Sequence, residues 1–156
     1  MSSGMITALR NLFSNRSFSK ISDTQELALV DTLALAMSAD HDVSAVEREE
    51  LTSLLRVLDW NQSTALKSYV EESLDKSRRY LAEPGGVLKY CMDISARLEE
   101  DWLREEAYYY AGRISTSDNR VDTNEHEFLQ ALVQALALDN DAQARIADQL
   151  LRETSF

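Results

Sequence analysis

The stretch SADHDVSAVE at residues 38–47 recurs in altered form as TSDNRVDTNE at residues 116–125. A shift of 78 positions, half of the 156 residues, superimposes the two stretches without a gap. The agreement continues downstream of both stretches, where apolar residues recur at helical spacing. The identical pairs under this shift are Asp40/Asp118, Val43/Val121, Glu47/Glu125, Glu49/Glu127, Leu51/Leu129, Leu54/Leu132 and Leu58/Leu136.

Each copy has the pattern of a helix, a short acidic turn and a second helix. Ser44 and Asp122 are favourable N-cap residues, and Glu47 and Glu125 follow them by three positions. This is the spacing of a capping box, in which each of the two residues satisfies the backbone N–H of the other. Capping alone therefore explains the spacing that the two copies share, and we favour this explanation.

Helical periodicity extends over the rest of the chain, and nothing alternates with period two for long enough to predict a strand. One proline and four glycines leave few turns, and the clearest break is Glu83-Pro84-Gly85-Gly86. The expected helices cover about 23–39 (with Ser22 or Asp23 as cap), 44–58, a segment capped by Asn61, 87–98, 102–114 (separate from the last or continuous with it), 122–137, and a closing helix from Asn140 or Asp141.

These patterns predict an all-α, compact single-domain helical bundle of about 7–8 helices with two pseudo-repeated helical hairpins. We expect an N-terminal amphipathic arm at residues 1–20 and one helical domain at residues 21–156. The repeat copies span about 23–75 and 101–153. In the arm, apolar residues share one face and the charged side chains are basic, so it either packs on the core or docks to a partner or membrane surface.

The net charge of −11 disfavours nucleic-acid binding, because such a surface repels phosphate backbones. No apolar run is long enough to span a bilayer, and no signal peptide is visible. The single Cys91 forms no internal disulfide, which favours a reducing compartment. We therefore expect a cytoplasmic protein, with peripheral membrane contact through residues 1–20 as the alternative.

The two acidic turns resemble a signature of TerB-like tellurite-resistance proteins, a small residue followed by Asp-Gly-x-hydrophobic-x-x-x-Glu. The resemblance covers roughly residues 22–152 and rests on finding the motif twice, as Ala39-Asp40 to Glu47 and as Ser117-Asp118 to Glu125. It implies a compact helical bundle, an association with chemical stress, and acidic loops suspected of binding divalent cations. The expected glycine is replaced by His41 and Asn119, and histidine adopts a left-handed backbone less readily than asparagine.

If a cation binds, its oxygen ligands are expected from Asp40, Glu47, Asp118 and Glu125, and calcium or magnesium suits an all-oxygen site. The turns are not EF-hands, because Ala45 stands where the loop needs glycine and Leu51 where it needs glutamate.

No catalytic residue is predicted. Neither histidine has a glutamate three positions before it, as a di-iron bundle requires. Cys91 lies on an apolar stripe, where a buried structural cysteine is the common case. The three tyrosines at 108–110 surround one helix, so at least one is expected at the surface or an interface.

The leading functional hypothesis is therefore a TerB-like stress-response protein that acts as a non-catalytic binding or scaffolding module with a protein partner. The alternative is an acidic helical adaptor that binds a protein or membrane surface without a metal.

Overall fold

A computed structural model describes residues 22–40, 43–56, 65–115 and 123–154. Within these ranges the chain forms helices and no strand, which confirms the all-α prediction. The helices are α2 (Asp23–Asp40), α3 (Ala45–Leu55), α4 (Leu66–Ala82), α5 (Gly86–Leu98), α6 (Asp101–Ser115), α7 (Thr123–Leu136) and α8 (Asn140–Thr154).

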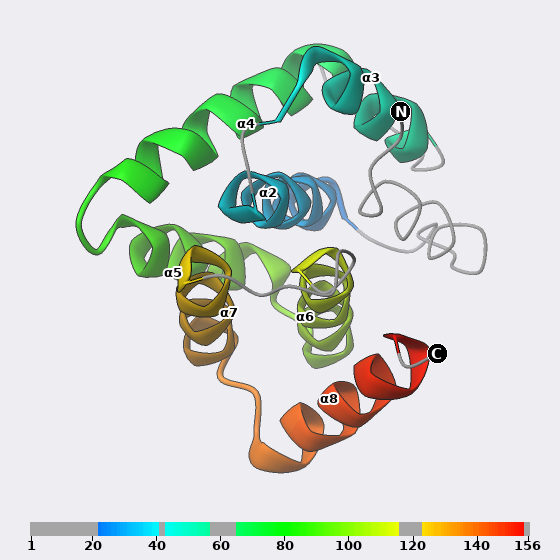
Figure 1. Ribbon diagram of the computed structural model, residues 1–156, viewed down its shortest axis with the longest axis vertical. Helices are drawn as coiled ribbons and strands as arrows, with labels where there is room; N and C mark the ends of the chain where they lie inside the picture. The colour runs from blue at the N-terminus through cyan, green and yellow to red at the C-terminus, as the bar shows by residue number, and fades with distance from the viewer. Residues whose placement is uncertain (1–21, 41–42, 57–64, 116–122, 155–156) are drawn as a thin grey trace.

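Helix α2 forms the centre of the bundle. It packs against α4, α5, α6 and α7, and Figure 1 shows it end-on with other helices on both sides. From Ala28 to Met37 no side chain is more than 1% exposed. A helix with apolar residues around its whole circumference is expected to be buried, so its sequence explains its place.

The start of α2 is fixed by the predicted cap. Ser22 Oγ accepts a hydrogen bond from the Gln25 backbone N–H at 3.2 Å, and Gln25 Oε1 accepts one from the Ser22 N–H at 2.9 Å. This reciprocal pair is a capping box. Gln25 Nε2 also donates to the Leu98 carbonyl at 3.0 Å, which ties the start of α2 to the end of α5.

The break predicted at residues 83–86 is confirmed as the turn between α4 and α5. Gly85 has φ +73°, a left-handed conformation that favours glycine. A Cβ at Gly86 would overlap the backbone carbonyl oxygen of Tyr80. The two glycines thus let the start of α5 lie directly against the last turn of α4.

The structure settles one open alternative about helix ends and corrects one expectation. The segments at 87–98 and 102–114 are separate helices, because Glu99 takes a left-handed φ of 63° and ends α5. Helix α4 begins at Leu66 with Ala65 as its N-cap and no side-chain cap, so Asn61 does not cap it. Asn61 itself lies outside the described residues.

Helix α8 packs on α6 at one end of the molecule, as Figure 1 shows. A Cβ on Gly112 would overlap the Leu150 Cδ1 methyl, so the absence of a side chain at Gly112 allows this close approach. The expected arm at residues 1–20 lies outside the described residues. None of the helices described has the length and apolar character that a bilayer crossing requires.

Two pairs of helices begin at positions that are related by the predicted shift of 78 residues. Asp23 and Asp101, which begin α2 and α6, are 78 positions apart, and so are Ala45 and Thr123, which begin α3 and α7. Each of the two helices packs against four others, α2 against α4, α5, α6 and α7, and α6 against α2, α5, α7 and α8. The duplication of the hairpins stays a prediction.

Candidate functional site

A buried carboxylate lies in the middle of the central helix. Asp31 is 1% exposed and has apolar neighbours along most of α2. Its Oδ1 accepts a hydrogen bond from Ser73 Oγ at 2.6 Å, and the Tyr69 hydroxyl lies 3.1 Å from both carboxylate oxygens. Tyr69 and Ser73 are four residues apart on α4, so they share the helix face that packs on α2.

Arg97 on α5 completes the arrangement from the other side. Its Nη2 lies 2.7 Å from Asp31 Oδ2 and 2.9 Å from Asp93 Oδ2, so one guanidinium joins a buried carboxylate to a surface carboxylate. Burial by itself lowers the pKa of Arg97, but Asp31 and Asp93 outweigh this effect and raise the pKa above its usual value. Arg97 therefore stays charged and neutralises Asp31.

The tyrosine hydroxyls around Asp31 are held in the protonated form. Burial raises the pKa of Tyr69 well above its ordinary value, and the neighbouring Asp31 raises it further. Burial and Asp31 have the same effect on the pKa of Tyr90. Tyr69 therefore acts as a neutral hydrogen-bond donor to a carboxylate that is ion-paired with Arg97.

The surface outside this cluster is hollowed. A cavity of about 520 Å³ reaches Asp31, Tyr69 and Ser73 at its floor. Its rim is charged, with the carboxylates of Glu72 and Asp75 and the cations Lys76 and Arg79. A second hollow of about 410 Å³ shares Lys76 and Arg79 and extends to Tyr80, Glu83 and Lys89 at the turn between α4 and α5.

The comparison with family models identifies the chain. Residues 26–148 match the model described as tellurite resistance protein TerB, which includes the central helix and both acidic turns. The chain belongs to the TerB family. Comparisons with curated proteins and with solved structures gave no significant match.

One capping box predicted from the sequence of this TerB-family protein is confirmed. Glu47 Oε1 accepts a hydrogen bond from the Ser44 backbone N–H at 3.0 Å, and Ser44 Oγ accepts one from the Glu47 N–H at 3.2 Å. The Glu47 side chain is only 9% exposed. Its carboxylate therefore serves the start of α3, as the capping interpretation requires.

The other predicted cation ligands are not tested. The side chains of Asp40, Asp118 and Glu125 lie outside the described residues. Among the side chains that the structure does describe, no group of three or more His, Cys, Asp or Glu residues could hold a metal ion. The calcium or magnesium site stays a prediction, and one oxygen of Glu47 is used in the cap.

The prediction that Cys91 is a buried core residue is confirmed. Cys91 is 0% exposed, and burial raises the pKa of its thiol to about 12. Since the thiolate is the reactive form, this thiol is a weak nucleophile near neutral pH. The tyrosine cluster is core and rim: Tyr109 and Tyr110 are buried, and Tyr108 is half-buried.

Sequence reasoning missed the Asp31 cluster. The signal in the sequence was a single carboxylate, Asp31, within an otherwise apolar stretch of α2. Since a buried charge needs a partner, this carboxylate predicts polar or cationic side chains nearby. Tyr69 and Ser73 at positions i and i+4 supplied a matching polar face on α4. The identity of the cationic partner was not readable, since Arg97 is far from Asp31 in sequence.

Proposed function

We propose that this TerB-family protein works in the response to tellurite or related chemical stress as a non-catalytic binding module. The observation that carries the proposal is the state of Asp31, the carboxylate at the centre of the fold. Its two oxygens are occupied by Arg97, Ser73 and Tyr69 of the same chain. Asp31 is thus buried and bonded within its own chain, which supports a structural role for this carboxylate.

The chemistry of the surrounding groups supports the same conclusion. The Cys91 thiol stays protonated because burial raises its pKa to about 12. Burial also raises the pKa of Tyr69 and of Tyr90, so neither is a base near neutral pH. The reactive side chains of this region are thus used as structural hydrogen-bond donors or core residues.

The surface over this core is suited to binding. Two adjoining hollows carry charged side chains of both signs on their rims, and they share Lys76 and Arg79. Their volumes of about 520 Å³ and 410 Å³ lie in the range of small-ligand sites. A buried helical core that presents a charged, concave surface is suited to a binding module.

The amount of protein needed for protection tests this role. A strain that lacks the gene receives the wild-type gene under a titratable promoter, and survival in tellurite is measured against the amount of protein. A binding module acts stoichiometrically, so we expect protection to rise in proportion to the protein until its partner is saturated. Full protection at a small fraction of the normal amount indicates turnover and overturns the proposal.

A matched variant separates binding from chemistry at the thiol. Cys91→Ser keeps a small side chain at the buried position and removes the sulfur. We expect the same dose–response curve as the wild type at equal levels of folded protein. Loss of protection by folded Cys91→Ser protein contradicts a non-catalytic role.

A further inference from the structure

A group of cations surrounds Tyr80 on a protein that is otherwise strongly acidic. The chain has 16 Lys and Arg against 27 Asp and Glu. The hollow at the turn between α4 and α5 reverses this balance, because Lys76, Arg79 and Lys89 line it together with a single carboxylate, Glu83. We call Lys76, Arg79 and Lys89 the basic cluster.

The basic cluster is not neutralised by the described residues. Some arginines on the described surface are paired with carboxylates, as in Arg78–Asp75, Arg145–Glu105 and Arg152–Asp148. No member of the basic cluster lies within ion-pair distance of a carboxylate in the described part of the chain. Unpaired like charges repel one another, so a bound anion would relieve this repulsion.

One member of the basic cluster, Lys76, is oriented by aromatic packing. The Tyr80 and Tyr90 rings stack with centroids 4.5 Å apart and planes 12° apart. The Lys76 ammonium lies 5.2 Å from the Tyr90 centroid, within cation–π range. The half-buried Lys76 side chain is therefore oriented before a ligand arrives, which lowers the entropy lost on binding.

The turn between the two helices brings the third cation to the others. Gly85 and Gly86 allow α5 to start directly against the last turn of α4, because a side chain at Gly86 would overlap the Tyr80 carbonyl. Lys89 lies one helical turn into α5, and its side chain lines the same hollow as Arg79. The cluster thus combines two helices across a tight, defined turn.

We propose that the basic cluster binds the phosphate group of a small soluble phosphorylated molecule. A phosphate dianion needs more than one cation, and a guanidinium offers it two parallel N–H donors while ammonium groups add point charges. The adjoining hollow over Asp31 gives room for the rest of the molecule, and Glu72 and Asp75 on its rim can accept hydrogen bonds from hydroxyl groups. This proposal names a ligand for the binding module and rests on that role.

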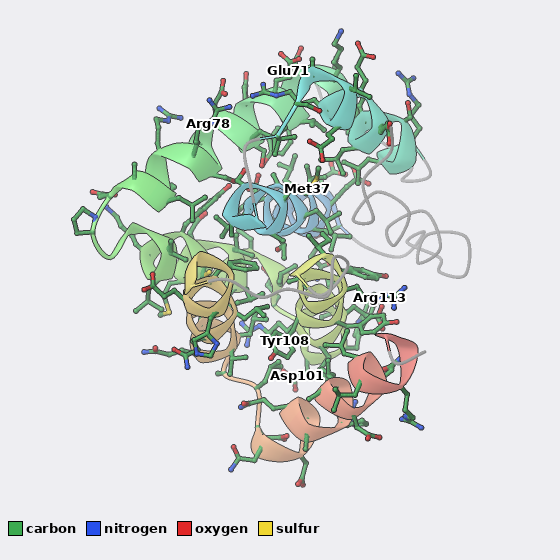
Figure 2. The ribbon with its side chains drawn as sticks, viewed as in Figure 1. Met37, Glu71, Arg78, Asp101, Tyr108 and Arg113 are labelled. Atoms are coloured by element: carbon green, nitrogen blue, oxygen red, sulfur yellow. The ribbon has the colours of Figure 1, made fainter. Side chains whose placement is uncertain are left out.

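The α3–α4 hollow is a weaker candidate for an anion. It is lined by the cations Arg48, Arg56 and Lys67, but also by two carboxylates, Glu49 and Glu71. The net charge of its lining is therefore +1, against +2 for the hollow at the basic cluster. Figure 2 shows Glu71 on the outer side of α4, where it faces solvent.

Titration of the full chain with pyrophosphate at constant ionic strength tests the proposal, with backbone amide NMR shifts as the readout. We expect saturable shifts centred on residues 76–89. Arg79→Glu should weaken binding by about tenfold or more, since it removes a charge-assisted donor and adds a negative charge beside the anion. Glu83→Gln should bind more tightly, because it removes the one carboxylate from the hollow.

Arg78→Glu is the matched control. Arg78 is the neighbouring residue on α4, it is exposed, and it lines neither of these two hollows; Figure 2 shows it on the outer side of the helix. Its substitution changes the net charge by the same amount as Arg79→Glu, so we expect an affinity close to that of the wild type. Equal losses in the two variants would mean a general charge effect and would overturn a defined site.

Two further outcomes also overturn the proposal. One is the absence of saturable shifts with pyrophosphate. The other is Arg79-dependent binding to vesicles of phosphatidic acid, with none to pyrophosphate, which would assign the cluster to a membrane. If these titrations fail but the dose–response curve is stoichiometric, the phosphate ligand is rejected and the binding module is kept. If trace amounts of the protein give full protection, the binding module itself is rejected.

Discussion

Arg97 Nη2 lies 2.7 Å from Asp31 Oδ2, and this ion pair joins α5 to a buried turn of α2. Arg97 is 22% exposed while the Asp31 side chain is 1% exposed, so the pair connects the surface to the core. The same Nη2 also lies 2.9 Å from Asp93 Oδ2, so a single nitrogen of the guanidinium contacts both carboxylates. This relationship is the basis of the first prediction.

Removal of Arg97 should strongly destabilise the fold. Arg97→Met leaves a buried carboxylate without its cation, and loss of one partner of a buried pair costs about 3–5 kcal/mol in the free energy of unfolding. Urea denaturation followed by circular dichroism measures the change. The double variant Asp31→Asn/Arg97→Met should recover part of the loss, because an amide needs no counter-charge.

The control for this prediction is the exposed pair Arg78–Asp75, in which Arg78 Nη2 lies 3.6 Å from Asp75 Oδ1. Arg78→Met should change the free energy of unfolding by no more than about 0.5 kcal/mol, since exposed ion pairs contribute little. A similar loss in Arg78→Met and Arg97→Met would contradict the special importance of the buried pair.

The stability of the protein should fall at alkaline pH. The folded-state pKa of Cys91 is raised from 9.0 to about 12, and the pKa values of Tyr69 and Tyr90 are raised from 10.0. A raised folded pKa contributes stability that is fully present below the unfolded pKa and is lost as pH rises through the folded pKa. We therefore expect the urea midpoint to be constant near neutral pH and to fall from about pH 9 upward.

Cys91→Ala isolates one part of this alkaline loss. Without the thiol, the contribution that starts at about pH 9 disappears and only the tyrosine contribution, which starts at about pH 10, is left. The slope of the unfolding free energy between about pH 9 and pH 10 should therefore be smaller in the variant. An identical slope in both proteins contradicts a buried, protonated Cys91.

The capping box of α3 should have a measurable effect on stability. Ser44→Ala removes the side-chain acceptor for the Glu47 N–H, and loss of such a cap costs about 1 kcal/mol. Thermal unfolding measures the effect, with Glu49→Gln at an exposed position of the same helix as the control. If Glu49→Gln costs as much as Ser44→Ala, the effect is one of helix charge rather than of the cap.

The two glycines of the α4–α5 turn should respond differently to substitution. Gly86→Ala places a Cβ onto the Tyr80 carbonyl oxygen, so the turn must open and the free energy of unfolding should fall by about 1–3 kcal/mol. Gly85→Asn should be milder, since nothing lies within 4 Å of a Cβ there and asparagine tolerates a left-handed backbone. Equal effects in chemical denaturation would mean that the conformation of the turn, rather than close packing, limits both positions.

Cation binding by the acidic turns has a separate test. Titration calorimetry with calcium and magnesium should show whether Asp40, Asp118 and Glu125 bind an ion. Because Glu47 Oε1 is already bonded to the Ser44 N–H, we expect Glu47→Gln to lower stability more than it changes any cation affinity. No heat with either ion, together with an unchanged melting temperature, leaves the turns as structural caps.

The amino-acid sequence by itself determined the helical class, the break at Pro84-Gly85-Gly86, the capping box at Ser44 and Glu47, and the resemblance to the TerB family. The first three depend on residues within a few positions of one another, where periodicity, backbone preference and capping act. The resemblance depends on one such local pattern that occurs twice, 78 positions apart. Features formed by residues that are close in sequence can be predicted from the sequence directly.

Only the tertiary structure decided which distant side chains meet. Asp31 on α2 and Arg97 on α5 are 66 positions apart, and nothing local to either residue names the other. The same holds for Lys89, which completes the basic cluster only because two glycines let α5 fold back onto α4. Such contacts depend on the packing of whole helices, and this packing is set by the summed burial of many apolar side chains rather than by any short pattern.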